Sequence, residues 1–376
     1  MNTNKLLYKK IKRRILKSIK SLEHGQRIPS RIELAKEYGV TRTTIERAVS
    51  ELIGEGFLYT KDGSGTYVSD LYKKETKKLN NVNQWGVVIP NIMHDTYPEI
   101  LRGVEDVASD NKINTLVCNT DNNPQKQKQY INNLIDTGIN GIIIVPSIIE
   151  DGDTSVFRKL QNKAIPFIAC NRGIPGIQSP KVVSNNFYGG YMATKHLIEQ
   201  GYKRIAFIAN IYYLVSVERY QGYIAALSEA GIEINEEYVI FEEYSSSFID
   251  LHKVKKIGYE KVKELLNSPD KPDAFFCFDD TVAQGAYYAI TEKGFNAGRD
   301  IGLVGYNNNY YICKSLPGKL TSVDFNSYKV GNQAARLLLN ILHGEKVKKN
   351  ITIVIQPKLK VRGSSKKMSI PQGRGV

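Results

Sequence analysis

The sequence predicts an α/β protein in which a small helical domain with a β-hairpin precedes a larger two-lobed domain built on parallel sheets. Three observations support this division. The first 56 residues hold three helical patterns and lead into a hairpin signal, whereas short apolar runs alternate with helical patterns from Gln84 onward. Residues 1–83 contain 18 Lys and Arg against 9 Asp and Glu, while residues 84–345 contain 25 against 29. This uneven charge predicts that the N-terminal piece meets a polyanion.

Three helices are expected at the N-terminus. The first covers residues 5–22, where an apolar residue recurs every four positions. The second begins after Ser30, which has capping-box spacing to Glu33, and it ends near Gly39. The third has Thr41 as its N-cap. Two short helices joined by a tight turn predict a helix-turn-helix motif.

A hairpin signal follows the third helix. The segment FLYTKDGSGTYV places two β-rich runs on either side of Asp62-Gly63. A helix-turn-helix followed by a hairpin is a winged helix, which we assign to residues 1–69. The polar and charged segment that comes next has few core-forming residues, and it predicts a linker over residues 70–83.

The remaining chain predicts two lobes over residues 84–364. The runs WGVVIP, NTLVCNT, GIIIVP and PFIAC each precede a helical pattern, and RIAFIA, YVIFEE, DAFFCF and GLVGY repeat the order. Near-continuous apolar strands alternating with helices indicate parallel sheets covered on both faces. Ligands of such sheets bind outside the carboxyl ends of the strands. Residues 365–376 lack apolar periodicity and are predicted to be a disordered tail.

Composition argues against several other classes of protein. No run of about 18 apolar residues indicates a membrane span, and the charged N-terminus lacks the apolar stretch of a secretory signal. A cytoplasmic location is therefore expected. The four cysteines are far apart and have no metal-ligand spacing, so neither a metal site nor a cofactor is expected.

The segment IPSRIELAKEYGVTRTTIERAVSELIGEGFLYTKDGSGTYV resembles the GntR family of winged-helix regulators along its whole length. The resemblance implies that this domain binds double-stranded DNA. Arg42, Thr43 and Thr44 occupy the first turn of the third helix, which is the end that enters a major groove. Arginine can pair with a guanine edge, and threonine hydroxyls at a helix N-terminus suit phosphates. The candidate DNA-binding residues are Ser30, Arg31, Thr41, Arg42, Thr43, Thr44, Arg47, Lys61, Gly63 and Ser64.

Two positions depart from the GntR pattern. The family often has arginine where this chain has Ile32, and it favours arginine where this chain has Glu46. An acid facing a phosphate repels it, so Arg31 and Arg47 are the neighbours that could supply the missing contacts. For Gly63, plain turn geometry is as good an explanation as close approach to DNA.

Residues 85 to about 364 resemble the effector domains of the LacI/GalR regulators, which share the fold of periplasmic sugar-binding proteins. The resembling stretches include VVSNNFYGGYMATKHLIEQGYKRIAFIA, DAFFCFDDTVAQGAYYAI and KLTSVDFNSYKVGNQAARLLLNIL, in the same order as in the family. The resemblance implies a periplasmic-binding-protein-like domain that holds a small-molecule effector, most simply a sugar, between its lobes.

Five positions align with ligand-binding positions of that family, although Asn171 and Asn307 stand where the family usually has Asp. Together they suit a neutral polyol, which needs fixed donors, acceptors and an aromatic face. Arg219 as a structural ion pair and Tyr97 as a core or interface residue are the alternatives. Asp280 is expected to cap the helix over residues 281–293. The candidate ligand-binding residues are Tyr97, Asn171, Arg219, Asp279 and Asn307.

These features predict a homodimeric transcriptional repressor of carbohydrate-utilisation genes that an arabinose-like sugar releases from its operator. A nucleoside or sugar acid as effector, or a ligand that promotes DNA binding, is the alternative. A pyridoxal-phosphate enzyme fused to a winged helix would need a longer second domain and an active-site lysine motif, which we do not find. A transport binding protein would not carry a winged helix.

Overall fold

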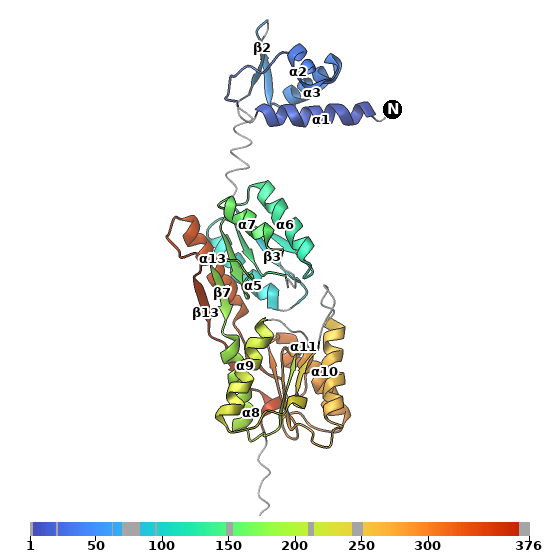
Figure 1. Ribbon diagram of the computed structural model, residues 1–376, viewed down its shortest axis with the longest axis vertical. Helices are drawn as coiled ribbons and strands as arrows, with labels where there is room; N and C mark the ends of the chain where they lie inside the picture. Colours follow the sequence, from blue (N-terminus) through green and yellow to red (C-terminus); the bar gives the residue numbers. More distant parts are fainter. Residues whose placement is uncertain are drawn as a thin grey trace, which may run out of the picture. The chain divides into compact units, whose positions relative to one another are not determined.

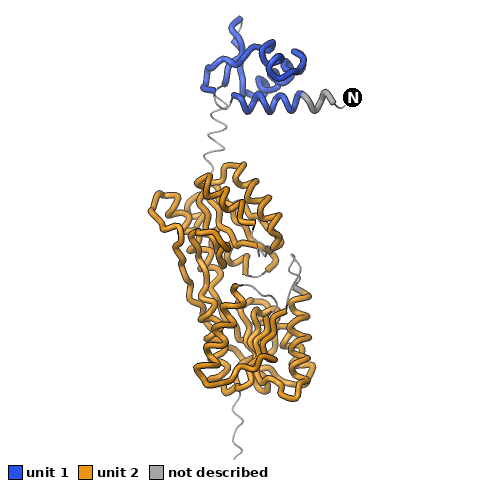
Figure 2. The backbone as a smooth tube through the Cα atoms, viewed as in Figure 1, with its two compact units in different colours: residues 1–82 blue, residues 83–376 orange. Residues whose placement is uncertain are grey.

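The computed structural model describes residues 3–19, 22–61, 63–69, 83–94, 96–147, 153–209, 214–242 and 251–367. The chain divides into two compact units, residues 1–82 (unit 1) and residues 83–376 (unit 2) (Figure 2). Except for residue 83, the predicted linker lies outside the described residues, as do residues 368–376 of the predicted tail. No helix of the described part is both long and apolar enough to cross a membrane.

Unit 1 is a winged helix, as predicted. Its helices are α1 (Thr3–Ser18), α2 (Arg31–Tyr38) and α3 (Arg42–Gly54), and its strands β1 (Leu58–Lys61) and β2 (Gly65–Val68) pair antiparallel (Figure 1). The apolar faces of the three helices and the hairpin enclose one small core, in which Ile45 and Leu52 of α3 are fully buried. Helix α1 ends four residues earlier than the sequence pattern predicts.

The caps of α2 and α3 are those read from the sequence. Ser30 accepts a hydrogen bond from the Glu33 amide while the Glu33 carboxylate accepts one from the Ser30 amide, which completes the capping box. Gly39 ends α2 in the left-handed conformation, at φ 64°. Thr41 then caps α3 by accepting from the Thr44 amide. The turn between the helices is thus fixed by local chemistry.

Unit 2 contains two six-stranded sheets, one in each of two lobes (Figure 1). In lobe 1 the strand order is β13-β7-β6-β5-β3-β4, and every pairing is parallel. Its elements are β3 (Gln84–Ile89), α5 (Thr96–Asp110), β4 (Asn114–Asn119), α6 (Pro124–Thr137), β5 (Gly141–Ile144), α7 (Ser155–Asn162), β6 (Phe167–Cys170), β7 (Lys181–Ser184), α13 (Ser327–Leu342) and β13 (Thr352–Ile355).

Lobe 2 has the strand order β14-β12-β11-β10-β8-β9, and only the edge strand β14 runs antiparallel to its neighbour. Central strands of both lobes are buried along their whole length, as near-continuous apolar runs require. The elements are α8 (Asn186–Glu199), β8 (Ile205–Ala209), α9 (Leu214–Glu229), the 3₁₀ turn η2 (Glu236–Tyr238), β9 (Val239–Phe241), α10 (Leu251–Leu265), β10 (Ala274–Cys277), α11 (Asp280–Glu292), β11 (Gly302–Tyr306), α12 (Tyr310–Ser315), β12 (Thr321–Asp324), β14 (Lys358–Lys360) and the 3₁₀ turn η3 (Gly363–Ser365).

Helices of unit 2 pack in pairs whose backbones touch at glycines. In the α8–α9 pair, a Cβ on Gly190 would lie 2.1 Å from the Arg219 carbonyl oxygen, and one on Gly222 would lie 2.0 Å from that of Phe187. The same reciprocal contact joins α5 to α13 and α10 to α11. Because no side chain fits at these crossings, the backbone of α9 is held at a fixed distance from α8.

Three segments connect the lobes: β7 to α8, β12 to α13, and β13 to β14. They are hydrogen bonded to one another. The Asn185 amide donates to the Ile355 carbonyl oxygen at 3.0 Å, and the Asn326 side chain donates to the Gln356 carbonyl oxygen at 2.9 Å. The lobes are therefore joined by a narrow bundle of connections, which is the geometry of a hinge.

The C-terminal part of lobe 2 is ordered past the predicted domain end. Ser365, which the prediction places in the tail, is fully buried, and its hydroxyl is 2.7 Å from the His196 ring nitrogen Nε2. It also donates to the Thr321 hydroxyl at 2.7 Å. All four cysteines are buried and free.

Candidate DNA-binding and ligand-binding sites

The N-terminus of α3 presents unengaged side chains to solvent. Arg42 and Thr43 are exposed, and among the described residues neither makes an ion pair or a side-chain hydrogen bond. Thr41 and Thr44 instead bond to each other, with 2.9 Å between their hydroxyl oxygens. Arg42 is therefore available to a base edge, while the hydroxyls of Thr41 and Thr44 are already engaged with each other.

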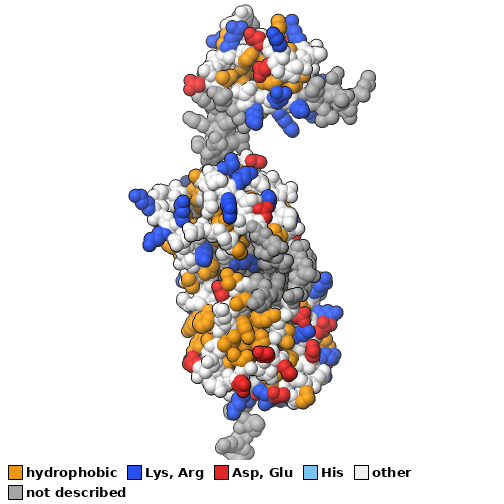
Figure 3. Space-filling view, in the orientation of Figure 1, with side chains coloured by type: hydrophobic (Ala, Val, Ile, Leu, Met, Phe, Trp, Pro, Cys, Tyr) orange, Lys and Arg blue, Asp and Glu red, His pale blue; other side chains and the backbone are white. Residues whose placement is uncertain are grey.

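The wing carries a cation at its tip. The Lys61 ammonium lies 5.2 Å from the centroid of the Tyr67 ring, and the Ser64 hydroxyl is 2.5 Å from the Tyr67 hydroxyl. Gly63 has φ 69°, so turn geometry by itself favours glycine there. Asp62 lies outside the described residues. Lys and Arg side chains are spread over the visible face of unit 1 (Figure 3).

One departing position, Glu46, is paired with Arg31, the neighbour of the other departing position, Ile32. Arg31 Nε donates to Glu46 Oε1 at 2.8 Å, and Arg31 Nη1 donates to the Thr66 hydroxyl of β2 at 3.2 Å. The Arg31 charge is thus partly offset within the domain. Arg47 lies over the Tyr8 ring of α1, 4.1 Å from its centroid, so its guanidinium also has a partner inside unit 1.

In lobe 2, Arg219 of α9 is held against the carboxyl ends of β10 and β11. Its Nη1 donates to the Phe278 carbonyl oxygen at 2.6 Å, and its Nε donates to the Asn186 side chain at 3.2 Å. The guanidinium carbon lies 3.5 Å from the Tyr306 ring centroid. Burial raises the pKa of Tyr306, which keeps this ring neutral beneath the cation. None of these contacts is with a carboxylate, so they leave the Arg219 charge without neutralisation by an ion pair.

The helix cap that the sequence analysis assigns to Asp280 is provided by the adjacent Asp279. Asp279, and not Asp280, caps α11: its Oδ1 accepts from the Val282 amide at 2.8 Å. Asp280 is 1% exposed and accepts from the Asn309 amide at 2.6 Å and from the Ser322 hydroxyl at 2.7 Å. The prediction that Asp280 caps this helix is wrong because the helix begins one residue earlier. Asp280 instead anchors the loop that carries Asn307.

The two candidate asparagines follow strands in opposite lobes. Asn307 comes directly after β11 with φ 102°, and Asn171 follows β6 with φ 67°. The backbone amide of each residue donates a hydrogen bond to a neighbouring strand. Asn307 donates to the Val323 carbonyl oxygen, and Asn171 donates to that of Val182. Arg219, Asp279 and Asn307 are brought together in lobe 2, since Arg219 contacts the residue before each of the other two.

Tyr97 is not presented to solvent. It is 5% exposed and packs in the core of lobe 1, with its ring centroid 5.2 Å from that of His94. Of the alternatives weighed for this residue, the structure places it in the core. A stacking role would require lobe 1 to uncover the ring.

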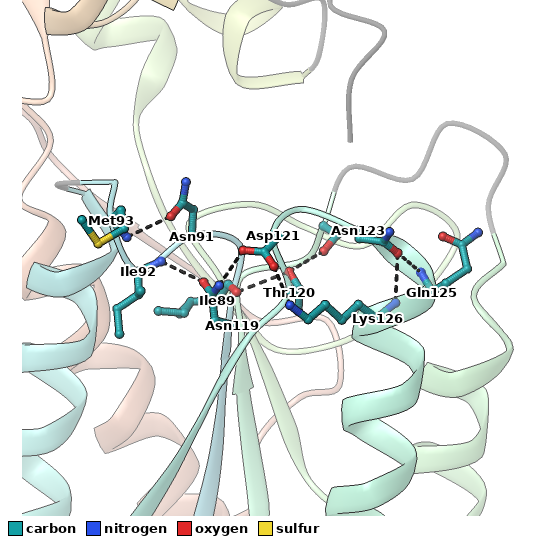
Figure 4. Close-up of polar contacts among 11 residues, drawn as sticks. Ile89, Asn91, Ile92, Met93, Asn119, Thr120, Asp121, Asn123, Gln125 and Lys126 are labelled. Carbon is teal, nitrogen blue, oxygen red and sulfur yellow. Dashed lines mark hydrogen bonds and ion pairs between the residues drawn. The ribbon is translucent and has the colours of Figure 1, made fainter. Parts of the chain in front are cut away.

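Lobe 1 supplies a polar edge that the residue-by-residue prediction missed. At the carboxyl ends of β3 and β4, Asn119 Oδ1 accepts from the Ile92 amide at 2.8 Å, and its Nδ2 donates to Asp121 at 2.6 Å (Figure 4). Lys126 of α6 donates to the other oxygen of Asp121 at 2.5 Å (Figure 4). Nearby polar residues are also buried: Asn91, Thr120, Asn122, Gln127 and Ser147. The signal was the run NTDNN directly after an apolar strand.

A cavity of about 530 Å³ opens between the lobes. Lobe 1 contributes the loop after β3 and the start of α5, and lobe 2 contributes α10, α11 and residues 307–312. Its volume falls in the range of small-molecule pockets. Of the five candidate ligand residues, Asn307 lines this cavity. Among the described residues, no group of three or more His, Cys, Asp or Glu could hold a metal ion.

Comparison with known families matches both units. Residues 7–68 match the family described as bacterial regulatory proteins, gntR family, and residues 194–365 match the periplasmic binding protein-like domain. These matches agree with the winged helix of unit 1 and with the two-lobed architecture of unit 2.

Individual proteins resemble this chain over three quarters of its length or more. It is 29% identical over 367 residues to an arabinose metabolism transcriptional repressor of Geobacillus stearothermophilus, which covers 96% of this chain and 98% of that protein. Its fold is similar to the transcription regulator CcpA of Lactococcus lactis, with a TM-score of 0.65 and 28% identity over 76% of this chain and 99% of that one. The transcriptional regulator CelR in complex with cellobiose gives a TM-score of 0.65 at 25% identity, covering 90% of this chain and 100% of that one.

Proposed function

We propose that this chain, in which one part matches the gntR family and another the periplasmic binding protein-like domain, is a transcriptional repressor that a sugar releases from its operator. The arrangement that carries this proposal is the presence, in one chain, of an exposed Arg42 on a recognition helix and a buried, unneutralised Arg219 at the carboxyl edge of a parallel sheet.

The DNA-binding half of the proposal rests on α3. Arg42 and Thr43 are exposed in its first turn. The Thr41 cap fixes the start of this helix, which is the end that would meet base edges. One winged helix reads one half-site, and a pseudo-palindromic operator therefore calls for a homodimer. Lys61 at the wing tip would add a phosphate contact.

The ligand half rests on polar side chains at or beside the carboxyl ends of strands in the two lobes. Arg219 offers a cation to a polyol, Asn307 lines the cavity, and Asp279 and Asn171 lie at strand ends of the two lobes. Neutral amides in place of carboxylates suit a ligand without charge. The relative named as an arabinose metabolism repressor and the CelR–cellobiose complex support a sugar, and a pentose such as arabinose is our first choice.

The hinge provides the link between the two halves. A ligand that contacts both lobes stabilises the closed arrangement over the open one by its differential affinity. Closure would rotate the lobes about the connections that contain Asn185, Asn326 and Gln356. We further propose that the protein acts in the cytoplasm and is not an enzyme.

The experiment is a two-step binding assay on the full-length protein. A thermal-shift screen against pentoses, hexoses, sugar acids and nucleosides identifies the effector, because a ligand that binds only the folded state raises the unfolding temperature. Fluorescence anisotropy on operator DNA then measures release. Release by a sugar supports the proposal. Release only by a nucleoside or sugar acid, or tighter DNA binding with ligand, would replace it with one of those alternatives.

A further inference from the structure

The base-facing side of α3 combines an arginine with an acid. Arg42 and Glu46 are four residues apart, so their side chains lie on the same face of the helix. Arg42 is exposed, and the Glu46 side chain is 47% exposed. An acid at this place needs an explanation, because every DNA phosphate would repel it.

The ion pair with Arg31 reduces that repulsion and engages only one of the two carboxylate oxygens of Glu46. Only Oε1 of Glu46 accepts from Arg31, at 2.8 Å, and Oε2 has no hydrogen bond among the described residues. Arg31 is itself tied to β2 through the Thr66 hydroxyl. The pair therefore fixes the Glu46 side chain in one orientation, offsets its charge, and leaves one oxygen that can accept a hydrogen bond.

A carboxylate can only accept hydrogen bonds, and the major groove offers it few partners. Guanine and thymine present acceptors there, and adenine presents its N6 donor beside the N7 acceptor, which repels a carboxylate. Cytosine presents the N4 amino donor with no acceptor on the same base edge. We propose that Glu46 is a specificity-determining residue that accepts from the N4 amino group of a cytosine in the operator half-site. This inference rests on the proposed function, because it requires that α3 enters the major groove.

The spacing on the helix places this contact near the one made by Arg42. Four residues of α-helix rise about 6 Å, and successive base pairs are about 3.4 Å apart. The half-site therefore contains a guanine read by Arg42 and a cytosine within one or two base pairs of it read by Glu46.

The test selects half-sites from random duplex DNA with the full-length protein and then measures affinity for every single-base substitution. For wild type, replacing the cytosine should weaken binding roughly five- to 150-fold. Glu46→Gln should lose this preference and shift it toward adenine, because glutamine pairs with the adenine edge. Arg42→Ala should lose the guanine preference at a different position and keep the cytosine preference.

A matched control separates base reading from helix stability. Glu51 also lies on α3 and is paired with Lys12 of α1 at 3.0 Å, so Glu51→Gln removes a similar ion pair on another face and should leave the base profile unchanged. A Glu46→Gln profile identical to wild type, with only overall affinity altered, would overturn the inference and reduce Glu46 to a partner of Arg31. Failure of wild type to select any sequence would instead refute the proposed function.

Discussion

Replacement of Arg219 by alanine should weaken both the stability of unit 2 and its response to ligand. The change removes a donor 2.6 Å from the buried Phe278 carbonyl oxygen and a cation 3.5 Å from the Tyr306 ring centroid. Loss of a hydrogen bond from a charged donor costs about 1.5–3 kcal/mol, and a desolvated cation–π contact contributes about 2 kcal/mol. The free energy of unfolding should therefore fall by about 3.5–5 kcal/mol. Hydrogen bonds from a charged group to ligand hydroxyls contribute about 1.5–3 kcal/mol, so ligand affinity should fall roughly ten- to 150-fold.

Operator binding without ligand should stay close to wild type, because Arg219 lies in unit 2 and α3 in unit 1. The assay is anisotropy of labelled operator with increasing ligand, together with chemical unfolding to measure stability. Arg299→Ala is the matched control: Arg299 lies on the surface of lobe 2 and pairs with the neighbouring Asp300. A variant of Arg219 that releases DNA at the wild-type ligand concentration would refute the binding role and leave Arg219 as a structural residue.

Three further predictions concern other parts of the chain. Arg42→Ala should cost about 1–3 kcal/mol at a specific operator and much less on random DNA, as measured by competition anisotropy; equal affinities for the operator would contradict the assignment. Gly222→Ala should destabilise unit 2 by about 1–3 kcal/mol, because its Cβ would lie 2.0 Å from the Phe187 carbonyl oxygen, and unchanged thermal unfolding would count against this packing. Burial lowers the pKa of His196, so the unfolded state takes up the proton more readily and stability should fall as the pH drops below about 6.5. His196→Gln should flatten that decline in thermal melts between pH 7.5 and 5.5, and an equally steep decline would show that other groups cause it.

Features that depend on neighbouring residues in the sequence could be predicted. The capping box at Ser30 and the left-handed Gly39 are interactions within one turn of chain, and both are confirmed. The strands of the two lobes were predictable for a similar reason, because a strand buried on both faces must be apolar at every position. The repetition of this strand–helix pattern along the chain then indicated two lobes, and the family resemblance agreed with it.

Features that depend on distant residues could not be predicted. The Arg31–Glu46 pair joins two helices through a tertiary contact, and nothing in the spacing of these residues shows that they meet. Asp279 and Asp280 are adjacent, and the choice between capping and anchoring depends on the exact start of α11, which sequence patterns locate only to within a few residues. The burial of Tyr97 depends in the same way on packing across lobe 1.

The reciprocity of the coupling tests the central claim most directly. If one protein links operator binding to sugar binding, each ligand must weaken the other by the same factor, which is typically about 5- to 150-fold. Calorimetry of the effector with full-length protein, free and saturated with operator, measures one side, and operator anisotropy with and without effector measures the other. The account predicts two equal factors greater than one. A sugar affinity that operator DNA leaves unchanged would contradict it.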